Sequence, residues 1–355
     1  MVNRLRSMSI ALVLIIGVVM SSALGAVDGT VLVDPPFGRH VRPLKVVLTR
    51  EEASVVGAME ILTRELSTGV PNTARAIEWR IESAAAGSRT LELSRKVLMA
   101  LQGIFERQGW TRVEKTHIVV ARTQAYINAQ LDSIGCYPNL AYTAGIHLMG
   151  ETVCGHRVIV INLTGYLFLR SAGSHLVLAM ESLPEPPMRT ISYRIADRNI
   201  SGLAHEWAHV ARASATGELV GVDEPAWFRE GFAEMLAGLA RVQAFSGRMS
   251  YLDFHVIRLR KFAQWESACK QSLASYRATS RFLGGCEYYV GVLGVELLLA
   301  RYGGLASLFK LFEHVASGDS FFTAFRDAYG ISLSTFERIA DRYVRGIRDI
   351  GTDVS

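Results

Sequence analysis

The chain has 355 residues, half of them apolar and a fifth charged, so it is long and apolar enough to build a sizeable core. Its formal net charge is +5, which becomes +3 once Arg4 and Arg6 of the N-terminal leader are left out. A charge this small and evenly spread excludes the electrostatic signature of a nucleic-acid-binding protein or of a protein that binds anionic membrane surfaces.

The first 26 residues are typical of an export signal. Arg4 and Arg6 form a positive start, residues 10–20 are an uncharged apolar run, and small residues then lead to a cleavage site near Ala26. An uncleaved anchor is the alternative, because residues 8–26 are about long enough to cross a bilayer. In both cases the remainder is exported, and the protein meets a membrane only if this segment is retained.

Four cysteines agree with an oxidising compartment. Their spacing favours two local disulfides, Cys136–Cys154 and Cys269–Cys286, although sequence alone permits three connectivities. Buried free thiols are the alternative.

The N-terminal part, residues 27–110, is predicted to be an extended lead-in followed by helix. Apolar residues recur at helical spacing from Glu51 to Gln108. Two strands are predicted next, at residues 116–121 and 156–163, because both segments are rich in β-branched residues. Residues 124–131 are predicted to form a helix between them.

The rest of the chain is predicted to be almost wholly helical. The expected helices cover residues from about 199 to 214, 225 to 241, 286 to 301, 321 to 329 and 335 to 347. A small sheet region followed by helices is an α+β arrangement. We therefore divide the chain into a leader (1–26), an N-terminal segment (27–110) and a main domain (111–350).

The segment His205-Glu206-Trp207-Ala208-His209 is an H-E-x-x-H pentapeptide. On a helix, residues four apart share one face, so both imidazoles can reach the same metal ion. Glu206 lies beside the first ligand, where it can take a proton from a metal-activated water molecule. A solvated helix face is the alternative, and the apolar residues around the histidines disfavour it.

A third ligand is required, because a catalytic zinc site has three protein ligands and one open position. Glu230 follows His209 by 21 positions in a second helix, so a helix hairpin would bring it back beside the histidines. Glu234 lies one turn further on and can accept a hydrogen bond from a ligand histidine. Gly231 is expected to relieve crowding where the two helices meet.

The segments HEWAH and PAWFREGFAEM resemble the gluzincin superfamily of zinc peptidases, most closely the bacterial proteins described as peptidase MA-like. Residues 141–163 are similar to the family's hairpin that leads into an edge strand. Residues 288–303, which end in a Tyr-Gly pair, and residues 320–343 are similar to its later helices. The resemblance covers about residues 115–347.

This resemblance implies a zincin-like domain with a small mixed or antiparallel sheet, whose edge strand at residues 158–162 pairs with extended substrate. It also implies that a tyrosine from the later helices stabilises the oxyanion of the tetrahedral intermediate. Tyr288 matches that position best and Tyr289 is the other candidate; a packing role for both is the alternative. His156, His175 and His255 have no ligand-spaced partner and are expected to be packed or exposed.

The sequence thus predicts an exported metallopeptidase that holds one zinc ion through His205, His209 and Glu230 and acts on a peptide or protein substrate. The lack of an aminopeptidase motif upstream of the zinc helix favours endopeptidase action. Two alternatives stay open: a zinc-binding protein without turnover that acts as a binding or structural module, with residues 51–108 as its docking surface, and a zinc hydrolase with a non-peptide substrate.

Overall fold

The computed structural model describes residues 31–33, 44–46, 48–66, 77–110, 115–136, 151–153, 158–162, 191–216, 223–246, 249–256, 269–278 and 286–351. The predicted leader at residues 1–26 lies outside these ranges, as do Cys154, His156 and His175. Two short N-terminal strands, β1 (Val31–Val33) and β2 (Leu44–Val46), pair antiparallel with each other.

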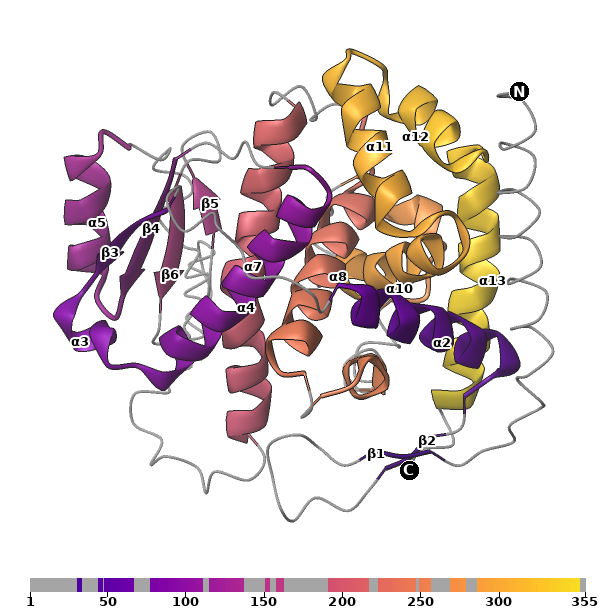
Figure 1. Ribbon diagram of the computed structural model, residues 1–355, viewed down its shortest axis with the longest axis horizontal. Coiled ribbons are helices and arrows are strands. Elements are labelled where there is room, and N and C mark those ends of the chain that lie inside the picture. Colours follow the sequence, from indigo (N-terminus) through magenta and orange to yellow (C-terminus); the bar gives the residue numbers. More distant parts are fainter. Residues whose placement is uncertain are drawn as a thin grey trace, which may run out of the picture.

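A four-stranded sheet lies at one side of the molecule, in the order β3-β4-β6-β5 (Figure 1). Its strands are β3 (Ile77–Ile81), β4 (Thr116–Ala121), β6 (Val158–Asn162) and β5 (Glu151–Val153). The first three are parallel, and only β5 runs antiparallel to its neighbour. The α+β class and a mixed sheet are confirmed, whereas an antiparallel sheet, the other form that the resemblance implies, is wrong.

The strand at residues 158–162 was expected to form an edge, and this is also wrong. β6 pairs with β4 along its whole length, and β5 covers its other side from Val158 to Val160. A run of β-branched residues is typical of a strand inside a parallel sheet, because both faces of such a strand are buried.

The two faces of the sheet carry different cores. In β4, Ile118 and Val120 belong to the main core, whereas Val119 and Ala121 face the other side. On that second side they pack with apolar residues of α5 (Gln124–Ser133). This alternation follows from the two-residue period of a strand. Figure 1 shows α5 on one side of the sheet and α4 (Arg89–Arg107) and α7 (Ile191–Thr216) on the other.

The N-terminal part departs from the predicted helix over residues 51–108. Two helices are present, α2 (Arg50–Glu65) and α4, but β3 and the short α3 (Ser83–Ala86) lie between them. In β3 the residues Ile77, Trp79 and Ile81 alternate with charged residues and pack against the main core. The alternating pattern of β3 covers only five residues, so it is hard to recognise between two long segments with helical periodicity.

The remaining helices pack beyond α7, away from the sheet (Figure 1). They include α8 (Ala226–Ala244), α10 (Cys286–Arg301), α11 (Gly304–Ala316), α12 (Phe321–Tyr329) and α13 (Leu333–Gly351), with the short 3₁₀ helix η3 (Leu273–Tyr276). The predicted positions of α8, α10, α12 and α13 are confirmed to within a few residues. α7 begins before residue 199, and α11 was not predicted.

One apolar core joins the N-terminal helices to the C-terminal ones. It runs from Val55 in α2, through Phe105 in α4 and Trp207 in α7, to Ile347 in α13. Among the described helices, none is by itself long and apolar enough to cross a membrane; α10 and α11 reach that composition only together, across a bend of 108°.

A fully buried ionic cluster holds α2 against this core. The imidazole of His255 has Nε2 2.7 Å from Oε1 of Glu52 in α2 and Nδ1 2.8 Å from Oε1 of Glu296 in α10. Tyr251 and Tyr343 donate hydrogen bonds to Glu296 as well. Because both ring nitrogens face carboxylate oxygens, both must donate, so the ring is an imidazolium. Burial lowers the pKa of His255, but the two carboxylates outweigh this effect and raise it to about 9.

Replacing His255 should therefore change how stability depends on pH. The folded-state pKa of about 9 lies above the ordinary value of 6.5, so the stabilisation is present below pH 6.5 and is lost as pH rises through 9. The stability advantage of the parent over His255→Gln should shrink by about 3 kcal/mol between pH 6.5 and pH 10. Urea unfolding at both pH values measures this; an advantage that stays constant contradicts the assignment.

Candidate metal centre

The two histidines of the pentapeptide lie on one face of α7. Their Nε2 atoms are 3.1 Å apart, and the rings meet edge to face with centroids 4.8 Å apart. The helix around them is buried on several sides, since Leu203, Ala204 and Trp207 all belong to the main core. The two histidines themselves are buried as well.

Glu230 of α8 completes the group, as the sequence predicted. Its Oε2 atom is 3.5 Å from Nε2 of His205 and 3.3 Å from Nε2 of His209. The three residues retain only 6%, 8% and 8% of their exposed surface, in the order His205, His209 and Glu230. A buried ion pair, Arg212 of α7 with Glu224, ties the start of α8 back to the helix that carries the histidines.

The spacing of these three atoms fits one tetrahedral metal ion. Bonds of about 2.0–2.1 Å to nitrogen and oxygen ligands place neighbouring ligand atoms of a tetrahedron roughly 3.3–3.4 Å apart. The separations here range from 3.1 to 3.5 Å. This buried His-His-Glu group could therefore hold a metal ion without rearrangement of the helices.

The charges of His205, His209 and Glu230 also favour the binding of a cation. Burial favours the neutral imidazole, but Glu230, Glu234 and Glu206 outweigh it at His205 and raise its pKa to about 9. At His209 burial dominates and lowers the pKa. Burial also disfavours the ionised carboxyl of Glu230, yet the two histidines hold its pKa well below the ordinary value. With a pKa of about 9, His205 carries a proton at neutral pH, and a metal ion that binds to this group would displace that proton.

The structure brings the other predicted site residues to the same place. Tyr288 of α10 stacks on His205, with ring centroids 5.7 Å apart and planes 25° from parallel. Burial, and then the surrounding carboxylates, raise the pKa of Tyr288, so its hydroxyl keeps its proton and can donate a hydrogen bond. Glu206 is half-buried and its negative charge acts on both histidines and on Tyr288. Tyr289 packs against the main core instead.

Glu234 lies close to the ring nitrogen for which it was predicted. Its Oε1 atom is 3.5 Å from Nδ1 of His205, longer than an ordinary hydrogen bond. Its side chain is 41% exposed, so the contact is that of two charges rather than of a buried hydrogen bond. Glu234 thus adds negative charge beside His205.

The close approach of α8 and α10 places Tyr288 beside the ligands. A Cβ atom on Gly231 would lie 2.3 Å from the carbonyl carbon of Gly291, and one on Gly291 would lie 2.1 Å from the carbonyl oxygen of Trp227. The two backbones are therefore in direct contact, one turn after Tyr288 and next to Glu230. The sequence predicts that Gly231 relieves crowding between the two metal-binding helices. In the structure, Gly231 instead allows the close approach of α10 to α8.

A disulfide fixes the start of α10. Cys269 and Cys286 are bonded, with Cα atoms 5.3 Å apart, which confirms the second predicted pair. Cys136 is disulfide-bonded too, but Cys154, its predicted partner, lies outside the described residues. A disulfide agrees with an oxidising, exported environment.

Three charged residues beside the centre were not predicted. Arg229 contacts Glu230, Arg212 pairs with Glu224, and Glu287 of α10 is buried with no hydrogen-bond partner for its Oε2 atom among the described residues. Burial, together with the charge of Glu230, raises the pKa of the Glu287 carboxyl. The sequence offered one signal, since Arg229 and Glu287 directly precede two residues that were singled out.

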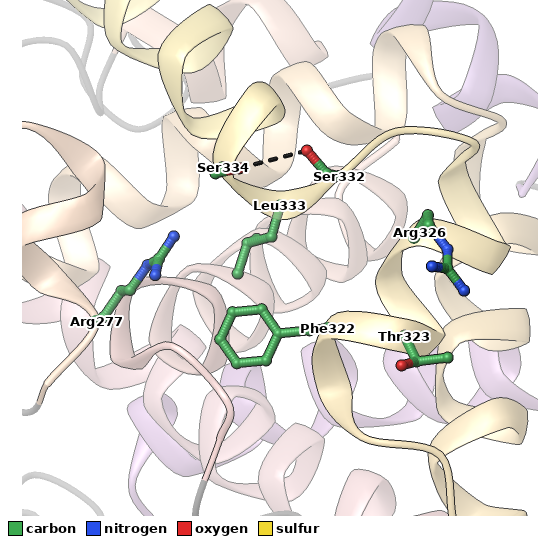
Figure 2. Close-up of a pocket in the computed structure, with 7 residues that line it drawn as sticks. All are labelled: Arg277, Phe322, Thr323, Arg326, Ser332, Leu333 and Ser334. Carbon is green, nitrogen blue, oxygen red and sulfur yellow. Dashed lines mark hydrogen bonds between the residues drawn. The ribbon is translucent and has the colours of Figure 1, made fainter.

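A separate pocket of about 360 Å³ lies between α12 and α13 and includes none of these residues (Figure 2). Figure 2 shows Arg277 and Arg326 on either side of the Phe322 ring. Both arginines are already paired, Arg277 with Glu337 and Arg326 with Asp327. The pocket therefore offers no unbalanced charge to a ligand.

Comparison of the chain with protein-family models, with curated proteins and with solved structures finds no match.

Substituting Gly231 should disturb the centre through the contact between α8 and α10. Gly231→Ala forces the two backbones apart and should cost about 1–3 kcal/mol of stability, with weaker metal binding because Glu230 is the neighbouring residue. Gly202→Ala on α7 is the matched control, since an added Cβ there meets nothing within 4 Å. It should leave metal binding intact. Equal effects of the two variants on urea unfolding and metal affinity would rule out this role of the contact.

Metal binding should depend on all three ligand residues. The chain from residue 27 onward should bind one divalent ion, and His205→Ala and Glu230→Ala should lose it. Metal at 100 times its Kd should stabilise the parent by about 2.7 kcal/mol and leave both variants unchanged. His314→Ala, which removes another histidine paired with a carboxylate, is the control. Elemental analysis and thermal unfolding measure this, and retention of metal by Glu230→Ala refutes the site.

Proposed function

We propose that the protein is an exported zinc-dependent peptidase of the gluzincin type. The observation that carries the proposal is the placement of the Tyr288 ring and the Glu206 charge beside a buried His-His-Glu group. Two imidazoles and one glutamate are the ligand set of catalytic zinc in several peptidases. Iron oxygenases use a similar set of donors, but a carboxylate base next to the first ligand favours hydrolysis.

A zinc ion held by these residues would act as a Lewis acid on the substrate carbonyl and lower the pKa of a coordinated water molecule to about 7. The chain supplies the remaining functions. Glu206 accepts the proton from water and returns it to the leaving amine. Tyr288 donates a hydrogen bond to the oxyanion, for which its raised pKa suits it.

The charges around His205 support its role as a ligand. Glu234 contacts the Nδ1 side of the ring, so Nε2 is left to face Glu230 and His209. At 3.5 Å this is a contact of charges, and a negative charge on the far side of a ligand histidine makes the ring a stronger donor to a metal ion.

For the substrate we propose an extended peptide that adds to the sheet as a strand. Among the described strands, β5 forms a sheet edge, because it pairs with β6 on one side only, and it contacts α7, the helix that carries the two histidines. Peptide pairing at such an edge uses main-chain hydrogen bonds and tolerates many sequences.

A zinc-binding protein without turnover is the competing proposal. It places the function in the N-terminal helices, as a docking surface for a partner. In the structure α2 and α4 contribute Val55, Met59 and Phe105 to the common core. This supports a part in the fold rather than a separate docking module.

The decisive variant is Glu206→Gln. With zinc bound, the parent should cleave an unfolded protein or a mixture of peptides, as followed by mass spectrometry. Glu206→Gln should lose about 10²–10⁴-fold in kcat while its zinc content and melting temperature stay the same. Glu234→Gln, which removes another carboxylate beside His205, should lose less. A zinc-loaded parent that cleaves nothing supports the binding protein instead, and equal cleavage by parent and Glu206→Gln excludes Glu206 as the base.

A further inference from the structure

Arg229 contacts the third ligand in a way that helix geometry alone does not impose. Neighbouring residues on a helix point about 100° apart, so their side chains do not ordinarily meet. Here Nε of Arg229 nonetheless donates a hydrogen bond of 3.0 Å to Oε1 of Glu230. The Arg229 side chain is 27% exposed and that of Glu230 only 10%, so the arginine folds over a buried carboxylate.

The two oxygens of Glu230 consequently have different partners. Oε2 faces Nε2 of His205 and of His209, and Oε1 faces Arg229. A carboxylate can bind a metal ion through one oxygen or through both. Binding through both would bring Oε1 to the ion as a fourth protein ligand in the position that a catalytic site leaves to water, and a water molecule could then bind only as a fifth ligand in a crowded shell.

Among the described residues, the arginine that contacts Glu230 is Arg229. Arg212 already forms an ion pair with Glu224. Burial lowers the pKa of Arg212 to about 10, and the positive charge of Arg229 is the next largest cause of this shift. Burial raises the pKa of the Glu287 carboxyl, whereas the positive charge of Arg229 lowers it by a smaller amount. With Arg212 already matched, Arg229 balances the negative charge of Glu230.

We infer that Arg229 is a positioning residue that holds Oε1 of Glu230 and restricts this ligand to one oxygen, so that a coordination position stays open for water. The inference rests on the proposed metal centre. It assigns a role in that centre to a residue that does not itself bind the metal ion.

Cobalt(II) provides the test, because it occupies zinc sites and reports its coordination number. Four-coordinate cobalt absorbs visible light more strongly than five-coordinate cobalt. The parent should bind one cobalt ion with an intense visible band. Arg229→Met keeps the apolar stem and removes the donor; it should bind cobalt about 10–100-fold more weakly and show a weaker band. Arg229→Lys restores the charge without the fixed Nε donor and should fall between the two.

Arg301→Met is the matched control. Arg301 is 38% exposed and forms an ion pair of 2.9 Å with Glu51, at the far end of α10 from Tyr288. This variant removes an arginine–glutamate pair of similar geometry and should keep the affinity and the spectrum of the parent.

The outcomes separate the inference from the proposed function. A folded parent that binds no cobalt refutes the metal centre and the role of Arg229 with it. If the parent binds cobalt and Arg229→Met has the same affinity and the same band, the metal centre stands and the role of Arg229 is overturned. If Arg229→Met does not fold, Arg229→Lys decides: a reduced band supports the role, and a spectrum identical to the parent's refutes it.

Discussion

The arrangement of the candidate centre depends on the contact between the backbones of α8 and α10. Gly231 and Gly291 allow the two helices to touch where any side chain would collide with main-chain atoms. This approach sets Tyr288 over His205, although the two residues come from helices that are far apart in the sequence. The disulfide at Cys286 fixes the start of α10, and the cluster around His255 holds its other half to α2.

The centre gathers negative charge in a place where the fold excludes most water. Glu206, Glu230 and Glu234 surround His205, and a protonated imidazole offsets part of their charge. Buried charges are costly unless they are paired or hydrogen-bonded, and a divalent ion is an efficient partner for carboxylates and imidazoles. The same charges that attract a cation also provide a proton acceptor beside it, so binding and hydrolysis would use one set of residues.

Features that are local in the sequence were predictable. The four-residue spacing of His205 and His209 places them on one helix face. The 21 residues from His209 to Glu230 allow a helix hairpin that brings Glu230 beside the two histidines. The order of strands in the sheet was not predictable, because pairing joins residues distant in the chain; β6 proved to be internal and the sheet mostly parallel. The contact of Arg229 with Glu230 was not predictable, because helical periodicity predicts contacts between residues three or four apart and not between adjacent residues.

The most direct test of the metal centre is X-ray absorption at the zinc edge of the zinc-loaded chain. We expect an ion bound by nitrogen and oxygen at about 2.0–2.1 Å, with the outer-shell scattering of two imidazole rings and no sulfur. Among the described residues, His205, His209 and Glu230 form the group that this pattern matches. A sulfur shell near 2.3 Å, or scattering without two imidazoles, would show that zinc binds elsewhere and would refute this centre.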